Sequence, residues 1–301
     1  MLEHSHLRLS GDEINSLTVS VVIPAYNEEA TIADVVVRVR KVDPSFEIVV
    51  VNDGSSDRTA ECALDAGAEV VSHPYPIGNG AAIKAGIRAS TGRILVFLDA
   101  DGQHPPEEIP KLLDKLRECD MAVGARTKDS SVSRFRTFGN WGLIKVANYL
   151  TGISIPDLTS GFRAIKRERV LEFVHLFPNT FSYPTTITLA LLKSGYPVGW
   201  VPLDSISARS LGHSKVKPLQ DGLRFIHIMV RLVMLFDPQR IFLPSSVLFM
   251  TVGVGLVINN LVLSGGIQQS SMLFIIVGVF IFFFGLLADQ VAHIRREISR
   301  K

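Results

Sequence analysis

Two aspartates one residue apart, Asp99 and Asp101, are the residues of this chain best suited to bind a cation. They follow the apolar residues 94–98, which predict a buried strand. Because both leave the same strand end, their carboxylates can direct hard oxygen ligands to one side, and Gln103 adds an amide oxygen. This set can hold Mg²⁺ or Mn²⁺ against a diphosphate, although Asp-x-Asp is also common in ordinary turns.

Two other predicted strands, 19–23 and 47–51, also end in polar loops. Ligands of open parallel sheets bind beside the carboxyl ends of the strands, so these loops are candidate ligand-binding segments. For Asp53, two interpretations stay open: it caps its own loop, or it accepts a hydrogen bond from a ribose or base. The loops read Pro24-Ala25-Tyr26-Asn27-Glu28-Glu29 and Asn52-Asp53-Gly54-Ser55-Ser56-Asp57.

The elements that must position these loops alternate between short β-branched runs and helical stretches. That alternation predicts an α/β fold, a parallel sheet flanked by helices. The predicted strands are 19–23, 47–51, 69–72, 94–98 and 121–124, and the predicted helices are about 28–41, 59–66, 80–90 and 106–118.

Several other functions are excluded by missing motifs. No G-x-G-x-x-G follows the first strand, and Gly78-Asn79-Gly80 lacks the third glycine of a dinucleotide site. No P-loop, G-x-S-x-G or clustered His/Cys zinc motif occurs either. The formal net charge is only +2, without a basic block, so nucleic acid is not an expected partner. Cys62 and Cys119 are expected to be ordinary core thiols in a reducing compartment.

Basic residues become prominent beyond residue 125. Each alone is most simply a surface charge, but several converging near a membrane would suit a lipid phosphate. Gly212 and Ser214 predict a mobile flap around two of them. The basic residues are Arg126, Arg134, Arg136, Arg163, Arg209 and Lys215.

Residues 241–288 contain no Asp, Glu, Lys, Arg or His. They predict two membrane spans, 241–263 and 272 to about 290, with a polar break between them; a hairpin buried in a soluble core is the alternative. Asn259 and Asn260 are expected at the headgroups, although a contact between the helices is also open.

The charges that flank these spans predict their orientation. Arg231 and Arg240 precede the first span, and Arg295, Arg296, Arg300 and Lys301 follow the second, while the connecting loop carries no charge. This pattern places both ends in the cytoplasm. No apolar stretch of a signal peptide occurs near the N-terminus.

Before the first span, polar residues recur every three or four positions within residues 219–236. Gln220, Arg224, His227 and Arg231 form this stripe among apolar residues. The pattern predicts a helix at the membrane interface; packing against the preceding domain is the alternative. The expected organisation is a polar tail (1–17), a catalytic domain (18–216), an interfacial helix (217–238), two spans (241–290) and a basic tail (291–301).

Residues 18–236 carry a set of motifs that resembles family 2 glycosyltransferases of GT-A fold. The resemblance is to polyprenyl-phosphate hexose synthases, which include dolichyl-phosphate mannose synthase, and the two-span tail is more similar to the bacterial members. The motifs are Val21-Val22-Ile23-Pro24-Ala25-Tyr26-Asn27-Glu28, Val51-Asn52-Asp53-Gly54-Ser55, Asp99-Ala100-Asp101-Gly102-Gln103, and Arg209 through Gly212-x-Ser214-Lys215.

The resemblance implies metal-dependent, inverting transfer of one hexose from GDP-mannose or a UDP-hexose to dolichyl or undecaprenyl phosphate. It assigns Asp99, Asp101 and Gln103 to the divalent metal. Asp101, Arg126, Arg209 and Lys215 are the implied catalytic residues. Nucleotide binding falls to Pro24, Tyr26, Glu28, Asp53, Asp99, Ala100 and Asp101, and acceptor phosphate binding to Arg126, Arg136 (or Arg134), Arg209, Ser214 and Lys215.

One departure from the family lies in residues 183–188. Many relatives have a carboxylate there, whereas this chain reads Tyr183-Pro184-Thr185-Thr186-Ile187-Thr188. A general base is not required, because a phosphate monoester with a second pKa of about 6 is already largely dianionic at neutral pH.

Two rival functions remain open. An enzyme that elongates a saccharide usually carries Gln-x-x-Arg-Trp and more spans, and this chain has neither. A non-catalytic membrane scaffold is disfavoured by the intact Asp99, Asp101 and Gln103. The sugar and the oligomeric state stay open, and relatives of this build can associate.

Overall fold

The computed structural model describes residues 18–126, 154–180, 183–203, 237–264 and 268–298, with a few single positions between these ranges. The chain forms two compact units, Met1–Phe225 and Ile226–Lys301. The polar tail, most of the expected interfacial helix, and Arg134, Arg136, Arg209, Ser214 and Lys215 lie outside the described residues.

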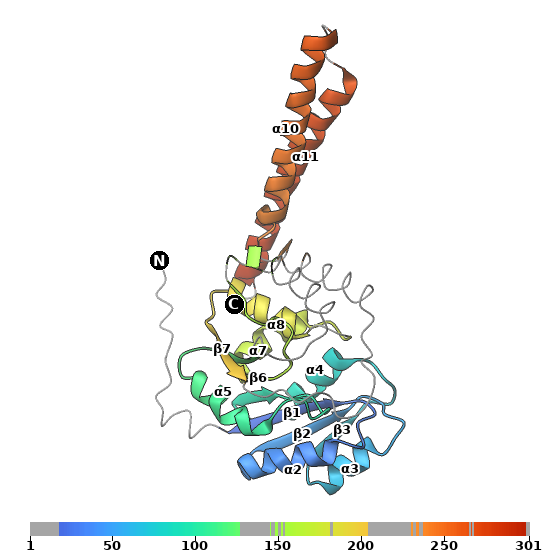
Figure 1. The fold of residues 1–301 in the computed structure, drawn as a ribbon, viewed down its shortest axis with the longest axis vertical. Helices are drawn as coiled ribbons and strands as arrows, with labels where there is room; N and C mark the ends of the chain where they lie inside the picture. The colour runs from blue at the N-terminus through green and yellow to red at the C-terminus, as the bar shows by residue number, and fades with distance from the viewer. Residues whose placement is uncertain are drawn as a thin grey trace. The chain divides into compact units, whose positions relative to one another are not determined.

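The first unit contains a seven-stranded sheet (Figure 1). Its strand order is β3-β2-β1-β4-β6-β5-β7, and all neighbouring pairs are parallel except the two pairs that include β6. The α/β expectation and the GT-A type of mixed sheet are confirmed. The strands are β1 (Val19–Ala25), β2 (Glu47–Asn52), β3 (Glu69–Ser72), β4 (Ile94–Phe97), β5 (Met121–Arg126), β6 (Arg163–Lys166) and β7 (Val198–Leu203).

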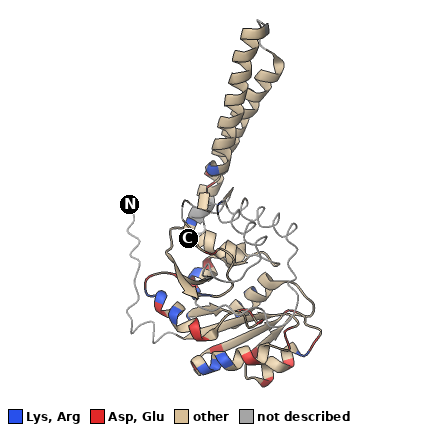
Figure 2. Ribbon diagram, viewed as in Figure 1, with Lys and Arg blue, Asp and Glu red and all other residues tan. Residues whose placement is uncertain are grey.

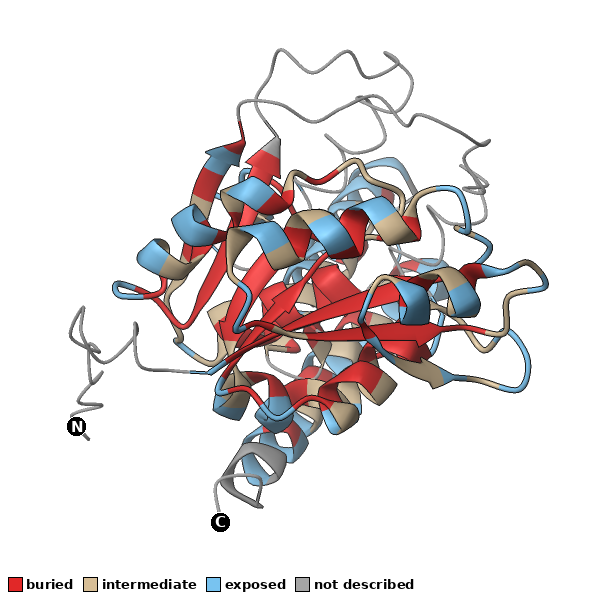
Figure 3. Ribbon diagram, turned by 90° about the horizontal axis from the view of Figure 1, so that it is seen from below, coloured by how far each residue is buried: buried red, intermediate tan, exposed pale blue. Residues whose placement is uncertain are grey.

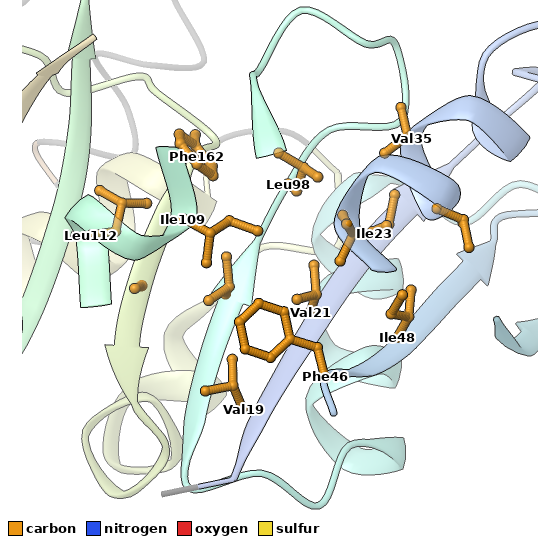
Figure 4. Close-up of a cluster of buried hydrophobic side chains, with 14 of the residues drawn as sticks. Val19, Val21, Ile23, Val35, Phe46, Ile48, Leu98, Ile109, Leu112 and Phe162 are labelled. Carbon is orange, nitrogen blue, oxygen red and sulfur yellow. The ribbon is translucent and has the colours of Figure 1, made fainter. Parts of the chain in front are cut away.

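One face of the sheet packs against α2 (Ile32–Val42), α3 (Thr59–Asp65) and α5 (Ile109–Lys115). Alternate residues of β1 point into this core, with Val21 and Ile23 between Ile48 and Leu98, as Figure 4 shows. A single-turn helix, η1 (Pro106–Glu108), leads directly into α5.

The opposite face packs against α4 (Asn79–Ala89), whose Ala82 joins Val49 and Val51. With both faces covered, the central strands are buried along their length, whereas the helices keep exposed outer sides (Figure 3). The described chain continues with α7 (Arg167–Phe173), the short η2 (Val174–Leu176) and α8 (Tyr183–Lys193). Every residue of α8 from Tyr183 to Leu191 is buried.

The first helix begins later than expected. The prediction of a helix from about residue 28 is wrong because Asn27 adopts a left-handed backbone, with φ of 54°, and residues 28–31 form a turn. The helix α2 therefore starts only at Ile32. This extra turn belongs to the loop after β1, so more of that loop lies at the candidate site.

The second unit contains α10 (Gln239–Ser264) and α11 (Gln269–Ile298), which pack against each other as a hairpin. Both are long and apolar enough to cross a membrane, and in their most apolar stretches only 11% and 17% of the residues are buried. Their long middle parts, within residues 241–288, contain no charged residue, and the charges of the two helices lie at the end near Arg240 (Figure 2). Exposed apolar surface of this extent argues against the core of a soluble protein.

Close contacts between small and polar residues join the two helices. A Cβ atom at Gly278 would lie 2.6 Å from the Met250 side chain, so the glycine permits close packing. Asn260 is buried and its Nδ2 donates to Ser271 Oγ at 2.7 Å. The contact between the helices that the sequence left open is thus formed at Asn260, where an unpaired amide would lose its hydrogen bonds. The expected headgroup level of Asn259 and Asn260 stays a prediction.

Candidate active site

The loops after β1 and β2 are hydrogen-bonded to each other. The backbone N–H of Asn27 donates to Ser55 Oγ at 2.9 Å, and the N–H of Ser56 donates to Asn27 Oδ1 at 2.9 Å. The left-handed backbone of Asn27 lets one residue use both its main chain and its side chain in this way. Asn52 Oδ1 accepts from the N–H of Ser55 at 3.0 Å, which closes the second loop on its own strand.

A second group of hydrogen bonds continues the contact between these loops. Glu28 donates its backbone N–H to Thr59 Oγ1 at 2.8 Å, and Glu29 donates its own to Asp57 Oδ2 at 3.2 Å. Partial burial works to raise the pKa of the Asp57 carboxyl, but bonds from Thr59 and the Glu29 N–H outweigh it and lower that pKa. Asp57 thus remains an ionised acceptor at neutral pH, and the two loops form one structure.

The loop after β4, which carries Asp99 and Asp101, is joined to the same structure through Thr31. Thr31 Oγ1 donates to the carbonyl oxygen of Ala100 at 2.8 Å. Ala100 is buried, and its carbonyl lies between the two aspartates in the sequence. The position of the Asp-x-Asp segment is therefore fixed relative to the first loop.

Asp53 holds a fourth segment, the loop between β3 and α4. Its carboxylate is buried and accepts from the N–H groups of Ile77 at 3.0 Å and Gly78 at 2.8 Å, while Oδ1 lies 2.7 Å from His73 Nδ1. The expectation that Asp53 caps its own loop is wrong, because these bonds hold a different loop. Its role toward a ribose or base stays a prediction. In the first turn of α4, the backbone N–H of Gly80 also has a partner, because it donates to the Thr180 carbonyl at 2.7 Å.

The Asp99 side chain is 37% exposed and lies above Gly161. A Cβ atom at residue 161 would come within 2.7 Å of Asp99 Oδ2, so a larger residue there would displace this carboxylate. Asp101 Oδ1 accepts from the N–H of Gln103 at 3.1 Å across Gly102, which has a φ of 70°. Two carboxylates and an amide on one tight loop are hard oxygen donors and fit a divalent cation.

Arg163 differs most from its expected role. It is completely buried, and its guanidinium donates to the carbonyl oxygen of Ser160, to that of Pro184 at 2.9 Å and to Thr188 Oγ1 at 3.1 Å. The expectation that Arg163 is a surface charge or a phosphate ligand is wrong. Its donors instead connect β6, the loop before it and the first turns of α8.

The guanidinium makes no ion pair with a carboxylate within the part of the chain that the structure describes. Burial lowers the pKa of Arg163, whereas Tyr183, Asp157 and Asp99 act to raise it. Burial also raises the pKa of Tyr183, whose hydroxyl donates to the Gly161 carbonyl at 3.2 Å. A neutral tyrosine and a charged arginine therefore support the backbone on which Asp99 rests.

The other expected site residues have varied surroundings. Pro24 is buried in β1, Glu28 is half-buried, and Tyr26 is 37% exposed. Arg126 is the last residue of β5, which runs parallel to β4, so its backbone lies at the same edge of the sheet as Asp99. Arg136, Arg209, Ser214 and Lys215 lie outside the described residues, so their acceptor role stays a prediction.

Sequence reasoning missed two residues of this site, Gly161 and His104, and gave a third, Arg163, the wrong role. Gly161 and Arg163 lie in a segment that reads as a loop, and His104 follows Gln103 without a recognisable role. The available signal was a group of threonines, Thr185, Thr186 and Thr188, in the otherwise mostly apolar segment 183–192, because a buried helix must satisfy its hydroxyls internally. Thr188 does so as a partner of Arg163.

Two known protein families match this chain. The glycosyl transferase family 2 matches residues 20–172, and the GtrB C-terminal hairpin family matches residues 237–294. The chain belongs to glycosyltransferase family 2. It is a glycosyltransferase and a membrane protein, with α10 and α11 as its C-terminal hairpin.

Two curated relatives cover most of the first unit. Polyprenol monophosphomannose synthase of Mycolicibacterium smegmatis is 34% identical over 65% of this chain and 80% of its own length. Dolichyl-phosphate hexose transferase of Haloferax volcanii is 32% identical over 67% of this chain and 88% of its own length. These similarities confirm the resemblance to polyprenyl-phosphate hexose synthases.

A solved structure supports the fold. Glucosyl-3-phosphoglycerate synthase from Mycobacterium tuberculosis, crystallised with Mn²⁺, UDP-glucose and phosphoglyceric acid, superposes with a TM-score of 0.57. It is 23% identical and covers 75% of this chain and 84% of its own. At that identity the similarity shows the GT-A fold alone.

Replacing the buried arginine tests its structural role. Arg163→Met should lower the free energy of unfolding by about 3 kcal/mol or more, because carbonyl and hydroxyl acceptors lose a buried donor. Arg167→Met is the matched control: Arg167 makes one described side-chain bond, to Ser90 Oγ at 3.0 Å, so its loss should cost about 1 kcal/mol. Denaturant unfolding followed by circular dichroism measures both, and equal losses would contradict the structural role.

Proposed function

We propose that this enzyme transfers one hexose from a nucleotide sugar to a polyprenyl phosphate at the cytoplasmic face of the membrane. The observation that supports this most directly is the set of three hydrogen-bonded loops that carries Asp99, Asp101 and Gln103 at one sheet edge. The names of the two curated relatives, both polyprenyl-phosphate sugar transferases, favour the same reaction.

The donor nucleotide is proposed to bind across the loops after β1 and β2. Tyr26 offers an exposed ring to the base, and Glu28 lies on the same loop. Pro24 and Ala100 contribute as buried backbone supports, and Asp53 keeps the neighbouring loop closed around the site. Because these segments are bound to one another before a ligand arrives, little ordering of the chain accompanies binding.

The divalent cation, Mg²⁺ or Mn²⁺, is proposed to be held by Asp99, Asp101 and Gln103. No group of three or more His, Cys, Asp or Glu residues in the described ranges is arranged to hold a metal alone. Two carboxylates, an amide and the donor diphosphate together provide enough oxygen ligands. A bound cation would stabilise the charge on the leaving nucleoside diphosphate.

The acceptor phosphate is proposed to bind Arg126, Arg136, Arg209, Ser214 and Lys215. One of its oxygens attacks the anomeric carbon of the hexose, forming a new carbon–oxygen bond as the bond to the nucleoside diphosphate breaks. The dianionic phosphate requires no general base, and no proton moves in this step. In-line displacement inverts the anomeric configuration.

The hairpin favours a lipid acceptor over a soluble saccharide. Two membrane-crossing helices keep the enzyme at the bilayer surface, where a polyprenyl chain is anchored. Arginines flank the pair, and its connecting segment is uncharged, which supports a cytoplasmic site. Elongation of a saccharide is the alternative that the first assay must exclude.

Substitution of the proposed metal ligands should abolish transfer. Full-length enzyme in detergent is incubated with undecaprenyl phosphate, Mg²⁺ or Mn²⁺, and separate nucleotide sugars, and glycolipid is detected by mass. We expect one donor to give product, with a loss of about 10²-fold or more in Asp99→Ala and Asp101→Ala. Asp114→Ala is the control, because Asp114 is exposed on α5 and is no proposed ligand. Turnover only with a saccharide acceptor would contradict the proposal.

Arg209→Ala should separate acceptor binding from donor binding. Loss of a phosphate ligand is expected to raise the KM for undecaprenyl phosphate by about tenfold or more, with nucleotide affinity unchanged. Arg93→Ala is the control, because Arg93 is exposed and precedes β4, at the opposite edge from Asp99. Weaker nucleotide binding in Arg209→Ala would mean that this segment serves the donor instead.

The orientation can be tested with single cysteines. Gln268→Cys, between the two helices, should react with a membrane-impermeant maleimide in spheroplasts, whereas Ser299→Cys, after α11, should react only after lysis. Wild-type protein controls for the native cysteines. The opposite labelling pattern would place the catalytic unit outside the cytoplasm.

A further inference from the structure

His104 is a buried histidine beside the proposed metal ligands. Its exposed fraction is 3%, and its ring stacks on Phe162 with centroids 5.5 Å apart and planes 18° apart. Phe162 is itself fully buried. The stacking fixes the plane of the imidazole, so that its nitrogens point in defined directions.

One ring nitrogen points toward Asp99. His104 Nδ1 lies 3.5 Å from Asp99 Oδ2, at the outer limit of a hydrogen bond. It has no hydrogen-bond partner among the residues that the structure describes, although it is buried. A buried ring nitrogen without a partner is unfavourable, and Asp99 Oδ2 is the acceptor that a small movement would bring into range.

The Asp99 carboxylate has a close neighbour on each of two sides, Gly161 and His104. Gly161 lies beneath the carboxylate, where a Cβ atom would come 2.7 Å from Oδ2. His104 faces the same oxygen from within the core. A carboxylate that binds a cation needs its remaining lone pairs oriented by neighbours, because free rotation of the group would weaken the site.

We propose that His104 is a positioning residue for Asp99. When Asp99 binds the divalent cation, Nδ1–H of His104 donates to Oδ2 and fixes the rotamer of the carboxylate. The neutral imidazole with its proton on Nδ1 is sufficient, so the role requires no change of charge. This inference rests on the proposed function only in that Asp99 is taken as a metal ligand.

Three substitutions separate the donor from the ring. His104→Phe keeps an aromatic ring for stacking on Phe162 but removes the donor. His104→Asn places an amide N–H near the position of Nδ1, whereas His104→Gln, one methylene longer, places it near Nε2. If Nδ1–H is the group that matters, Asn will restore the function and Gln will not.

The measurement is Mn²⁺ affinity of the full-length protein in detergent, read from the electron paramagnetic resonance signal of free Mn²⁺, with and without UDP or GDP. We expect His104→Phe and His104→Gln to weaken Mn²⁺ binding by about 10- to 100-fold, and His104→Asn to bind within a few-fold of wild type. Thermal unfolding of each variant reports whether the fold is kept.

Each contrary outcome has a definite meaning. Wild-type affinity in His104→Phe, or equal losses in the Asn and Gln variants, would overturn the positioning role while leaving the metal site intact. Asp99→Ala is the reference variant: if it binds Mn²⁺ as tightly as wild type, Asp99 is no ligand, and both the metal site and this inference are wrong.

Discussion

A positive charge that is sealed inside the protein organises the centre of this enzyme. The guanidinium of Arg163 donates to the main chain of Ser160, before β6, and to Pro184 and Thr188 in the first turns of α8. Such a group is stable only when its donors are satisfied, which couples the two segments geometrically. The backbone of Gly161, and with it the seat of Asp99, depends on this arrangement.

The remaining loops of the site depend on one another rather than on a shared core. Asn27, Thr31, Asp53 and Asp57 each bond to a loop other than their own. Their side chains are short, so the loops approach closely, and each bond constrains two segments at once. Such a structure gives a preorganised surface for a charged ligand, which is the condition for strong electrostatic stabilisation.

The sequence predicts the first half of the fold well, because residues 18–126 carry strong β-branched strands separated by helices. It fails at β6, a four-residue strand that begins with Arg163 and pairs with β4 across a long separation. A buried arginine cannot be distinguished from a surface one by residue type alone. The late start of α2 also depends on contacts between distant residues, because the left-handed backbone of Asn27 goes with its hydrogen bonds to the loop after β2.

The residues of the candidate site were also only partly predictable from the sequence. Asp99, Asp101 and Gln103 are recognisable from spacing, whereas the groups beneath them, Gly161 and His104, acquire their meaning only from distance. Asn260 shows the same limit in the membrane hairpin, because the sequence left a contact between the helices open and only the structure identifies Ser271 as its partner.

The placement of β6 between β4 and β5 also limits how early the sheet can form during synthesis. Until residues 163–166 have been made, β4 is an edge strand with unpaired N–H and C=O groups, and β5 has no partner to join it to the sheet. The segment bearing Asp99 is therefore translated long before its support exists. During that interval the edge of β4 is open to pairing with other chains, which is an aggregation risk for the nascent chain.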